Sequence, residues 1–223
     1  MNAPRRLFLL CLASLSLGPL AAACGAPHYT YVKNSDSKTY FRIPAQWHRF
    51  DDTALSNVLY GNTDSATAQL ERKLVWTVAY DAARTPSIDH LTTPASDDPI
   101  IIASVQPLTA ADQGKVSLDA LRNLGYMVTP EARQAQAQAQ AGTTDTSFEW
   151  LKDQVLTPGN GLRGVREIYN ASPGGNLLTT DRTVIASDDG HLYVLIIRCS
   201  AHCYRTHASE LDDIARSFTV RTQ

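Results

Sequence analysis

Clusters of basic residues are missing from this chain of 223 residues, in which no run of lysine and arginine is longer than a pair. Proteins that follow nucleic-acid phosphates need a clustered basic face. The formal net charge at pH 7 is −2, which also gives no general attraction to anionic lipid headgroups. The sequence therefore argues against nucleic acid as a partner, and a contact with a membrane must depend on something other than charge.

The short motifs of common enzymes and metal proteins are also missing. The chain has no Gly-x-Ser-x-Gly elbow, no His-Glu-x-x-His pair and no Walker loop. His48, His90 and His191 are scattered along it, and we expect each to be a surface or hydrogen-bonded histidine rather than a catalytic base. We therefore predict no catalytic residue, no cofactor and no metal site.

Two acidic pairs have local explanations as well. Asp188 and Asp189 precede a glycine, which is typical of a turn in which aspartate side chains bond nearby backbone. Asp212 and Asp213 are expected on the exposed face of the last helix. Neither pair requires a catalytic role.

One nucleotide-binding fingerprint fits by letter alone. The run Gly159-Asn160-Gly161-Leu162-Arg163-Gly164 has the spacing Gly-x-Gly-x-x-Gly, and Asp181 follows at about the distance that the fingerprint asks. That fingerprint must open a helix after a buried parallel strand, whereas residues 165–169 alternate as in a strand. We predict a hairpin tip here.

The only long apolar stretch is at the amino terminus. Residues 1–23 combine Arg5 and Arg6, an apolar stretch over residues 7–20, and three alanines before Cys24, which are the parts of an export signal. A membrane-spanning helix needs about 20 apolar residues, and this stretch is shorter and interrupted by serine, glycine and proline. Residues 1–23 are therefore predicted to be a removable signal peptide.

The end of this leader, Ala21-Ala22-Ala23-Cys24, resembles the lipobox of bacterial lipoproteins, although leucine stands one position earlier than the family prefers. The resemblance implies cleavage before Cys24, at least two acyl chains on that cysteine, and stable attachment to the outer face of the cell membrane. Ordinary secretory cleavage, with Cys24 left as a free thiol, is the alternative. Arg5-Arg6-Leu7-Phe8-Leu9 also resembles a twin-arginine signal, so the export route stays open.

Cysteine is scarce, with four in the chain, of which Cys11 is expected to leave with the leader and Cys24 is the predicted lipid site. Cys199 and Cys203 remain, and in an oxidising compartment two such cysteines are typical of a disulfide. If the segment turns helically, their Cα atoms lie about 6 Å apart, which is within bridging range. The alternative is a metal bound by this pair with His202 and His207, a spacing that is unusual for zinc.

Residue patterns after the leader predict one α+β domain over residues 38–223, preceded by a lipidated tether over residues 24–37 that is short and rich in turn formers. Alternating apolar residues and turn signals predict strands in eight segments, of which the fourth to the seventh are joined by hairpins. These segments are residues 40–43, 74–80, 100–105, 153–156, 165–169, 176–186, 191–197 and 217–220.

Helical spacing predicts helices over residues 65–73 and 117–124 and a final amphipathic helix that carries Ala208, Leu211 and Ile214. The glutamine and alanine tract within residues 131–142 has no large apolar face, so it is a solvated helix or a loose insertion. Strands that are mostly joined by hairpins and covered by helices predict a mostly antiparallel α+β sandwich.

Three segments of this pattern resemble the PsbP-like family, whose fold is shared by a Ran-binding nuclear import factor and by actinobacterial lipoproteins. The segments are Tyr40-Phe41-Arg42-Ile43-Pro44 with Trp47, the hairpin from residues 183–186 to 193–196, and Ile214-Ala215-Arg216-Ser217-Phe218-Thr219-Val220. They frame nearly the whole mature chain. The resemblance implies a noncatalytic binding or assembly factor. The family has no catalytic residue that could be assigned to a position in this sequence.

These observations lead to one functional hypothesis and one alternative. We expect a noncatalytic, membrane-anchored envelope lipoprotein whose ligand is a protein, a glycan or a small amphiphile. The alternative is an envelope hydrolase whose active site is assembled across loops. Converging polar groups with shifted pKa values would favour the hydrolase, and a smooth apolar groove would favour binding.

Overall fold

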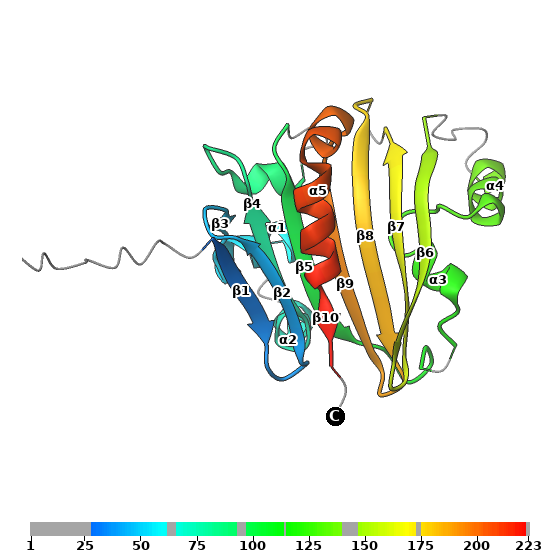
Figure 1. Ribbon diagram of the computed structural model, residues 1–223. Coiled ribbons are helices and arrows are strands. Elements are labelled where there is room, and N and C mark those ends of the chain that lie inside the picture. Colours follow the sequence, from blue (N-terminus) through cyan, green and yellow to red (C-terminus); the bar gives the residue numbers. More distant parts are fainter. Residues whose placement is uncertain are drawn as a thin grey trace, which may run out of the picture.

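A computed structural model describes residues 28–61, 66–92, 97–113, 115–139, 147–172 and 175–221 (Figure 1). The predicted leader and Cys24 lie outside the described residues. In chain order the elements are β1 (Tyr29–Asn34), β2 (Thr39–Pro44), β3 (His48–Arg49), α1 (Asp52–Tyr60), α2 (Ala66–Leu74), β4 (Trp76–Asp81), the short 3₁₀ helix η1 (Ile88–Leu91), β5 (Ile100–Pro107), α3 (Leu118–Arg122), α4 (Pro130–Ala139), β6 (Glu149–Gly159), β7 (Leu162–Ala171), β8 (Leu178–Ser187), β9 (His191–Ser200), α5 (Ala201–Ser217) and β10 (Thr219–Val220).

A seven-stranded antiparallel sheet with the order β3-β4-β5-β9-β8-β7-β6 forms the centre of the molecule. A small sheet of order β1-β2-β10 lies beside α5, and both cover one face of the large sheet (Figure 1). Helix α5 packs against β9, β8 and β2, while α3 packs on the opposite face against β7 and β8. The predicted α+β fold with a mostly antiparallel sheet is therefore confirmed.

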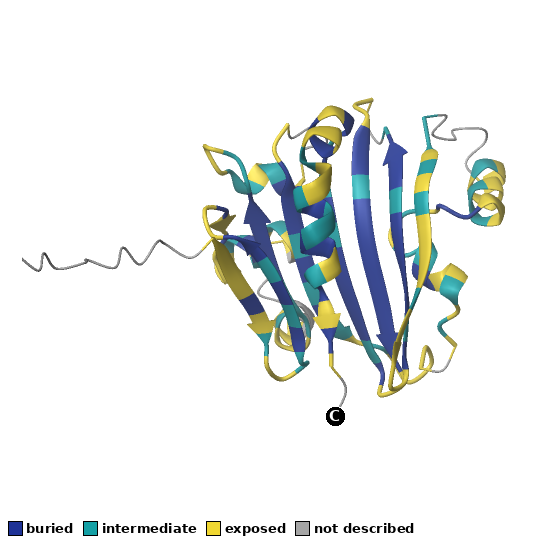
Figure 2. Cartoon of the chain, in the orientation of Figure 1, coloured by how far each residue is buried: buried dark blue, intermediate teal, exposed yellow. Residues whose placement is uncertain are grey.

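The main hydrophobic core fills the space between the large sheet and α5 with the small sheet. Ile43 of β2, Ile197 of β9 and Leu211 of α5 all have no exposed surface. A second cluster on the opposite face joins Leu121 of α3 to Val184 of β8. Figure 2 shows the resulting pattern, in which β7, β8 and β9 are buried along most of their length and β1, β6 and α4 are largely exposed.

The tether prediction was wrong for residues 29–34, which form strand β1 and pair with β2. The polar residues after β1 that look like a linker instead make a tight hairpin turn, in which the Asn34 side chain accepts a hydrogen bond from the Ser37 amide at 3.0 Å. Val32 is buried on the inner side of this hairpin. The domain therefore begins before residue 38.

The glutamine and alanine tract forms the solvated helix that its composition predicts. Helix α4 has no buried residue. It stands apart from the sheet in Figure 1. None of the helices in the described part of the chain has the length and apolar character that a membrane span needs.

Candidate functional site

The structure contains the predicted disulfide between Cys199, near the end of β9, and Cys203, in the first turn of α5. Their Cα atoms are 5.9 Å apart, and both cysteines are buried. Ser200 caps α5 between them by accepting a hydrogen bond from the Cys203 amide at 3.1 Å. The disulfide uses both of the thiols that the alternative metal site would need. The described residues contain no group of three His, Cys, Asp or Glu side chains placed to hold a metal.

Two of the three scattered histidines have a local acidic partner, and the third, His48, lies exposed on β3. His90 Nδ1 lies 2.7 Å from the buried carboxylate of Asp81. His191 Nδ1 lies 3.2 Å from Asp189, which also accepts a hydrogen bond from Ser187. In a serine triad the histidine stands between the serine and the carboxylate, whereas here the carboxylate stands between them. This order does not activate the Ser187 hydroxyl.

A buried ionic network that the sequence analysis did not foresee lies between β7, β8 and α5. The Arg166 guanidinium donates to both carboxylate oxygens of Asp181 at 2.9 and 2.6 Å. A third bond, from Arg166 Nη1 to Asp212, spans 2.7 Å. The Tyr204 hydroxyl donates to Asp181 at 2.8 Å, and burial raises the pKa of this hydroxyl. Arg166 and Asp181 are almost fully buried, so the network fixes α5 on the sheet.

Asp212 is thus only partly a solvent-facing residue, which corrects the expectation for this acidic pair. Asp213 follows the expectation and pairs with Arg216 on the outer face of α5. Asp212 instead reaches inward to Arg166. Burial opposes ionisation of Asp212, but the hydrogen bond and the positive charge of Arg166 outweigh it and hold the pKa of this carboxyl below its usual range.

A second buried ion pair lies on the opposite face of the same two strands. Glu167 and Arg182 are direct cross-strand partners, and Arg182 Nη2 lies 2.7 Å from Glu167 Oε2. Arg182 also donates to the backbone carbonyls of Arg122 and Leu124. These two bonds attach the end of α3 and the following loop to the sheet.

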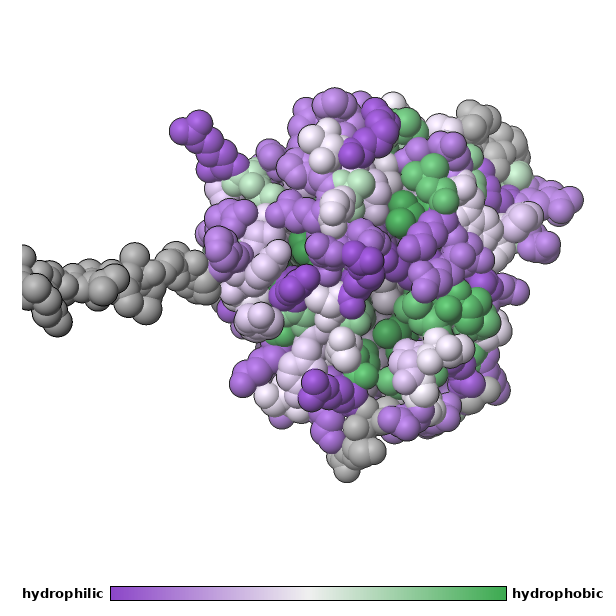
Figure 3. All heavy atoms as spheres, viewed as in Figure 1, coloured by the Kyte–Doolittle hydropathy of each residue, from purple (hydrophilic) through white to green (hydrophobic). Residues whose placement is uncertain are grey.

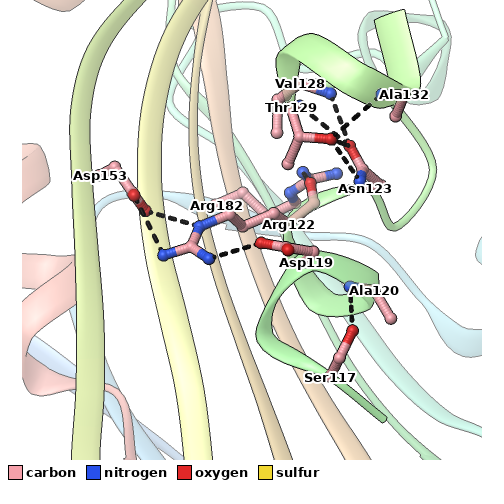
Figure 4. A network of polar contacts seen from close by, with 10 residues as sticks. All are labelled: Ser117, Asp119, Ala120, Arg122, Asn123, Val128, Thr129, Ala132, Asp153 and Arg182. Atoms are coloured by element: carbon pink, nitrogen blue, oxygen red, sulfur yellow. Dashed lines mark hydrogen bonds and ion pairs between the residues drawn. The ribbon is translucent and has the colours of Figure 1, made fainter.

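The loop from α3 to α4 is ordered by its own polar side chains (Figure 4). Asn123 Oδ1 accepts hydrogen bonds from the amides of Val128 and Thr129 at 2.9 and 3.0 Å, and Arg122 pairs with Asp119 and with Asp153 of β6. The backbone path of residues 123–129 is therefore fixed from both ends, and the side chains of its tip are held over the sheet.

Beneath this loop lies a cleft with a volume of about 310 Å³ and a mainly apolar lining. Its floor is the face of β7, β8 and β9 that is turned away from α5, and its rim is the tip of the loop. Tyr126 of the rim stacks on Tyr169 of the floor with ring centroids 5.4 Å apart. The lining residues are Leu124, Gly125, Tyr126, Tyr169, Ala171, Leu178, Thr180, Arg182, Ile196 and Arg198.

Two arginines enter this cleft, and they differ in their partners. Arg182 is neutralised by Glu167. Arg198 of β9 donates one hydrogen bond, from Nη2 to the backbone carbonyl of Leu91 at 2.7 Å. Within the described residues no carboxylate pairs with the Arg198 guanidinium, and burial lowers its pKa. The cleft thus combines apolar walls with one positive charge that no described carboxylate neutralises.

Two other hollows differ from this cleft in chemistry. A larger cavity of about 460 Å³ lies between the β1–β2 turn, α1 and α2, and its mainly polar lining includes side chains of both charges, such as Asp36, Asp52 and Lys73. A hollow beside α5 is lined by Leu156, Phe218 and neighbouring residues. Figure 3 shows apolar side chains gathering on that face next to α5. Its lining contains no charged side chain.

The sequence contains a signal for the two ionic networks, namely charged residues within predicted strands. Charged residues at positions 166, 167, 181 and 182 interrupt two strands whose other residues are largely buried. A charge in the middle of a central strand requires a partner. Arg198 stands in a third such strand, and only the fold shows that no carboxylate among the described residues pairs with it.

No known protein family matches the sequence, and no curated protein is similar to it. Solved structures are similar in fold. The cyanobacterial PsbP protein of Synechocystis is 15% identical, with a TM-score of 0.51 over 92% of this chain and 99% of that chain. LpqN of Mycobacterium tuberculosis, described as involved in cell envelope biogenesis, is 14% identical with a TM-score of 0.45 over 87% of this chain and 91% of that one. The Ran-binding protein Mog1p of Saccharomyces cerevisiae is 12% identical with a TM-score of 0.41 over 86% and 95%. The first likeness shows the fold expected from the three segments.

Proposed function

We propose that this chain is a noncatalytic binding protein, held at the outer face of a bacterial cell membrane by lipid on Cys24, whose ligand is a small amphiphile. The observation that carries the proposal is the apolar cleft between the loop of residues 123–128 and strands β7, β8 and β9. Small-molecule sites are typically concave and mostly apolar, with a few polar groups that orient the ligand. The cleft has this composition, and its volume is at the lower end of the range for such sites.

The fixed position of the rim supports a preformed site. Arg182 and Asn123 hold the two ends of the loop, so Tyr126 does not depend on a ligand for its place over Tyr169. A ligand that enters this cleft loses its own freedom but does not have to order the protein. Preformed sites bind small apolar molecules more tightly for that reason.

The proposed anchor would keep the domain near the bilayer. Cys24 carries the lipid in this proposal, and β1 begins at Tyr29. The chain between these two residues can span at most about 18 Å when fully extended. A domain with so short a connection stays close to the headgroups, where amphiphiles are concentrated.

The anchor is tested by the intact mass of the protein purified from its own membrane. We expect a chain that begins at Cys24, carries the mass of two or three acyl chains, and gains two hydrogens on reduction of the Cys199–Cys203 disulfide. Retention of residues 1–23, or a mature chain without acyl mass, would refute the anchor and leave the cleft untouched.

The cleft is tested with decan-1-ol, which matches its apolar walls. We expect the mature chain, residues 24–223 with Cys24→Ser so that no detergent is needed, to bind one decan-1-ol and to show amide shifts at Ala171, Leu178 and Ile196 in nuclear magnetic resonance spectra. Ile196→Trp fills the cleft and should weaken binding at least tenfold.

The matched control places the same new ring elsewhere. Leu70→Trp lies on the exposed surface of α2, away from the cleft lining, and should leave decan-1-ol binding unchanged. Absence of saturable binding, or equal effects of the two tryptophans, would show that the cleft is not a ligand site.

A further inference from the structure

Arg182 and Arg198 enter the cleft from neighbouring strands, but the fold treats them differently. Arg182 has a buried carboxylate, Glu167, directly opposite on β7, together with two backbone carbonyls of the rim. All of these contacts serve the structure. Arg182 therefore has its charge and its donors satisfied before any ligand arrives.

Arg198 lacks a comparable set of partners among the described residues. Its cross-strand partners are Thr180 on β8 and Ile100 on β5, neither of which is charged. One of its five N–H donors is used by the Leu91 carbonyl. In the described part of the chain no carboxylate pairs with it. A half-buried guanidinium with free donors and no counterion is costly, and an anion in the cleft would remove most of that cost.

The remaining lining residues define what such an anion must carry. Ile196 lies two residues from Arg198 on the same face of β9, and Leu178 and Ala171 are cross-strand partners on the neighbouring strands. The stacked rings of Tyr126 and Tyr169 lie across β8 from Arg198, with Thr180 between Tyr169 and Arg198 in the same cross-strand row. An apolar chain can lie along this surface from the guanidinium toward the rings. The volume corresponds to about ten water-sized positions, which suits a chain of medium length.

We infer that the ligand is an oxyanion amphiphile, a carboxylate or phosphate group on an apolar chain, and that Arg198 binds the oxyanion while the chain lies on Ile196, Leu178 and Ala171. This inference rests on the proposed function, because it assigns a charge and an orientation to the ligand of the same cleft. The planar fork of a guanidinium binds carboxylate and phosphate oxygens in pairs. Arg198 is thus the specificity-determining residue.

The experiment compares three probes with the same chain: decan-1-ol, decanoate and decyl phosphate, each titrated into the mature Cys24→Ser chain at low salt. We expect decanoate or decyl phosphate to bind about 10 to 100 times more tightly than decan-1-ol, as charge-assisted hydrogen bonds allow. The tighter of the two anions identifies the headgroup. Arg198→Met should abolish the preference and leave the affinity for decan-1-ol within about twofold, since methionine keeps an apolar side chain of similar length.

Arg205→Met is the matched control, because it removes one positive charge from the exposed face of α5 and should leave the preference intact. Binding of decan-1-ol by Arg198→Met also shows that this variant is folded. If decan-1-ol binds as tightly as both anions, or if Arg198→Met keeps the preference, this inference is wrong while the proposed function stands. If no probe binds, the proposed function fails as well.

Discussion

Replacing Asp181 with asparagine is expected to lower the free energy of unfolding by about 3 kcal/mol, because it leaves the buried Arg166 guanidinium without its main counterion. The carboxylate has no exposed surface and accepts three hydrogen bonds, two from Arg166 and one from Tyr204. Asparagine keeps the shape of the side chain but not its charge. The remaining partner Asp212 keeps the loss at the lower end of the range for broken buried pairs. Urea denaturation followed by circular dichroism measures the change.

Asp212→Asn is the matched control on the same guanidinium. About a third of the Asp212 side chain is exposed, so solvent weakens its pairing and we expect a loss of only about 1 kcal/mol at neutral pH. The pKa of this carboxyl is lowered in the folded state, so its contribution to stability is present above the ordinary pKa of 3.8 and disappears as the pH falls through the lowered folded value. The free energies of unfolding of the wild-type protein and of Asp212→Asn should therefore converge in acid. Equal losses for Asp181→Asn and Asp212→Asn would show that burial does not control the network.

Most of the elements could be predicted because local chemistry determines them. The hairpins at residues 159–161 and 188–190 are specified by glycine, asparagine and aspartate at the turns, and alternation in the flanking strands fixes which residues are buried. The Cys199–Cys203 bridge also follows from local spacing, since the chain turns directly from the end of β9 into α5 and brings the two Cα atoms to 5.9 Å.

Features that depend on distant pairing could not be predicted in the same way. Strand β1 carries too few buried residues to be recognised alone, and it becomes a strand because β2 lies beside it while β10, from the other end of the chain, pairs with the far side of β2. The partner of Arg166 is known only from the register that places β8 beside β7 and α5 above both. A sequence shows that a buried charge needs a partner, but not which one.

The cleft depends on distant pairing even more strongly. Its floor comes from three strands and its rim from a loop about 50 residues before the nearest part of β8. Arg198 resembles any other strand arginine in the sequence. Its importance arises from what the fold does not place next to it, and only the structure can show that.

The run Gly159-Asn160-Gly161-Leu162-Arg163-Gly164, which fits a nucleotide fingerprint by letter, owes its last glycine to the packing of the sheet. A Cβ atom on Gly164 would lie 2.6 Å from the Val184 carbonyl oxygen and 2.8 Å from Ile185 Cγ1. The first of these atoms belongs to the backbone of β8 and cannot move without breaking the pairing of β7 with β8. The role of Gly164 is therefore close contact between strands, as the hairpin interpretation requires.

Gly164→Val is accordingly expected to lower the free energy of unfolding by about 3 kcal/mol, since overpacking against a rigid strand has no room to relax. Gly159→Ala provides the comparison: Gly159 has a φ of 84° but no atom within 4 Å of an added Cβ, so only the strain of a left-handed residue remains, about 1 kcal/mol. The two variants are compared by thermal and urea unfolding. If Gly159→Ala lowers the free energy of unfolding more than Gly164→Val does, the conformation of the hairpin tip, rather than the contact with β8, is the main reason for glycine in this segment. The reverse order would explain the fingerprint-like spacing by the turn and the strand contact, with no nucleotide needed.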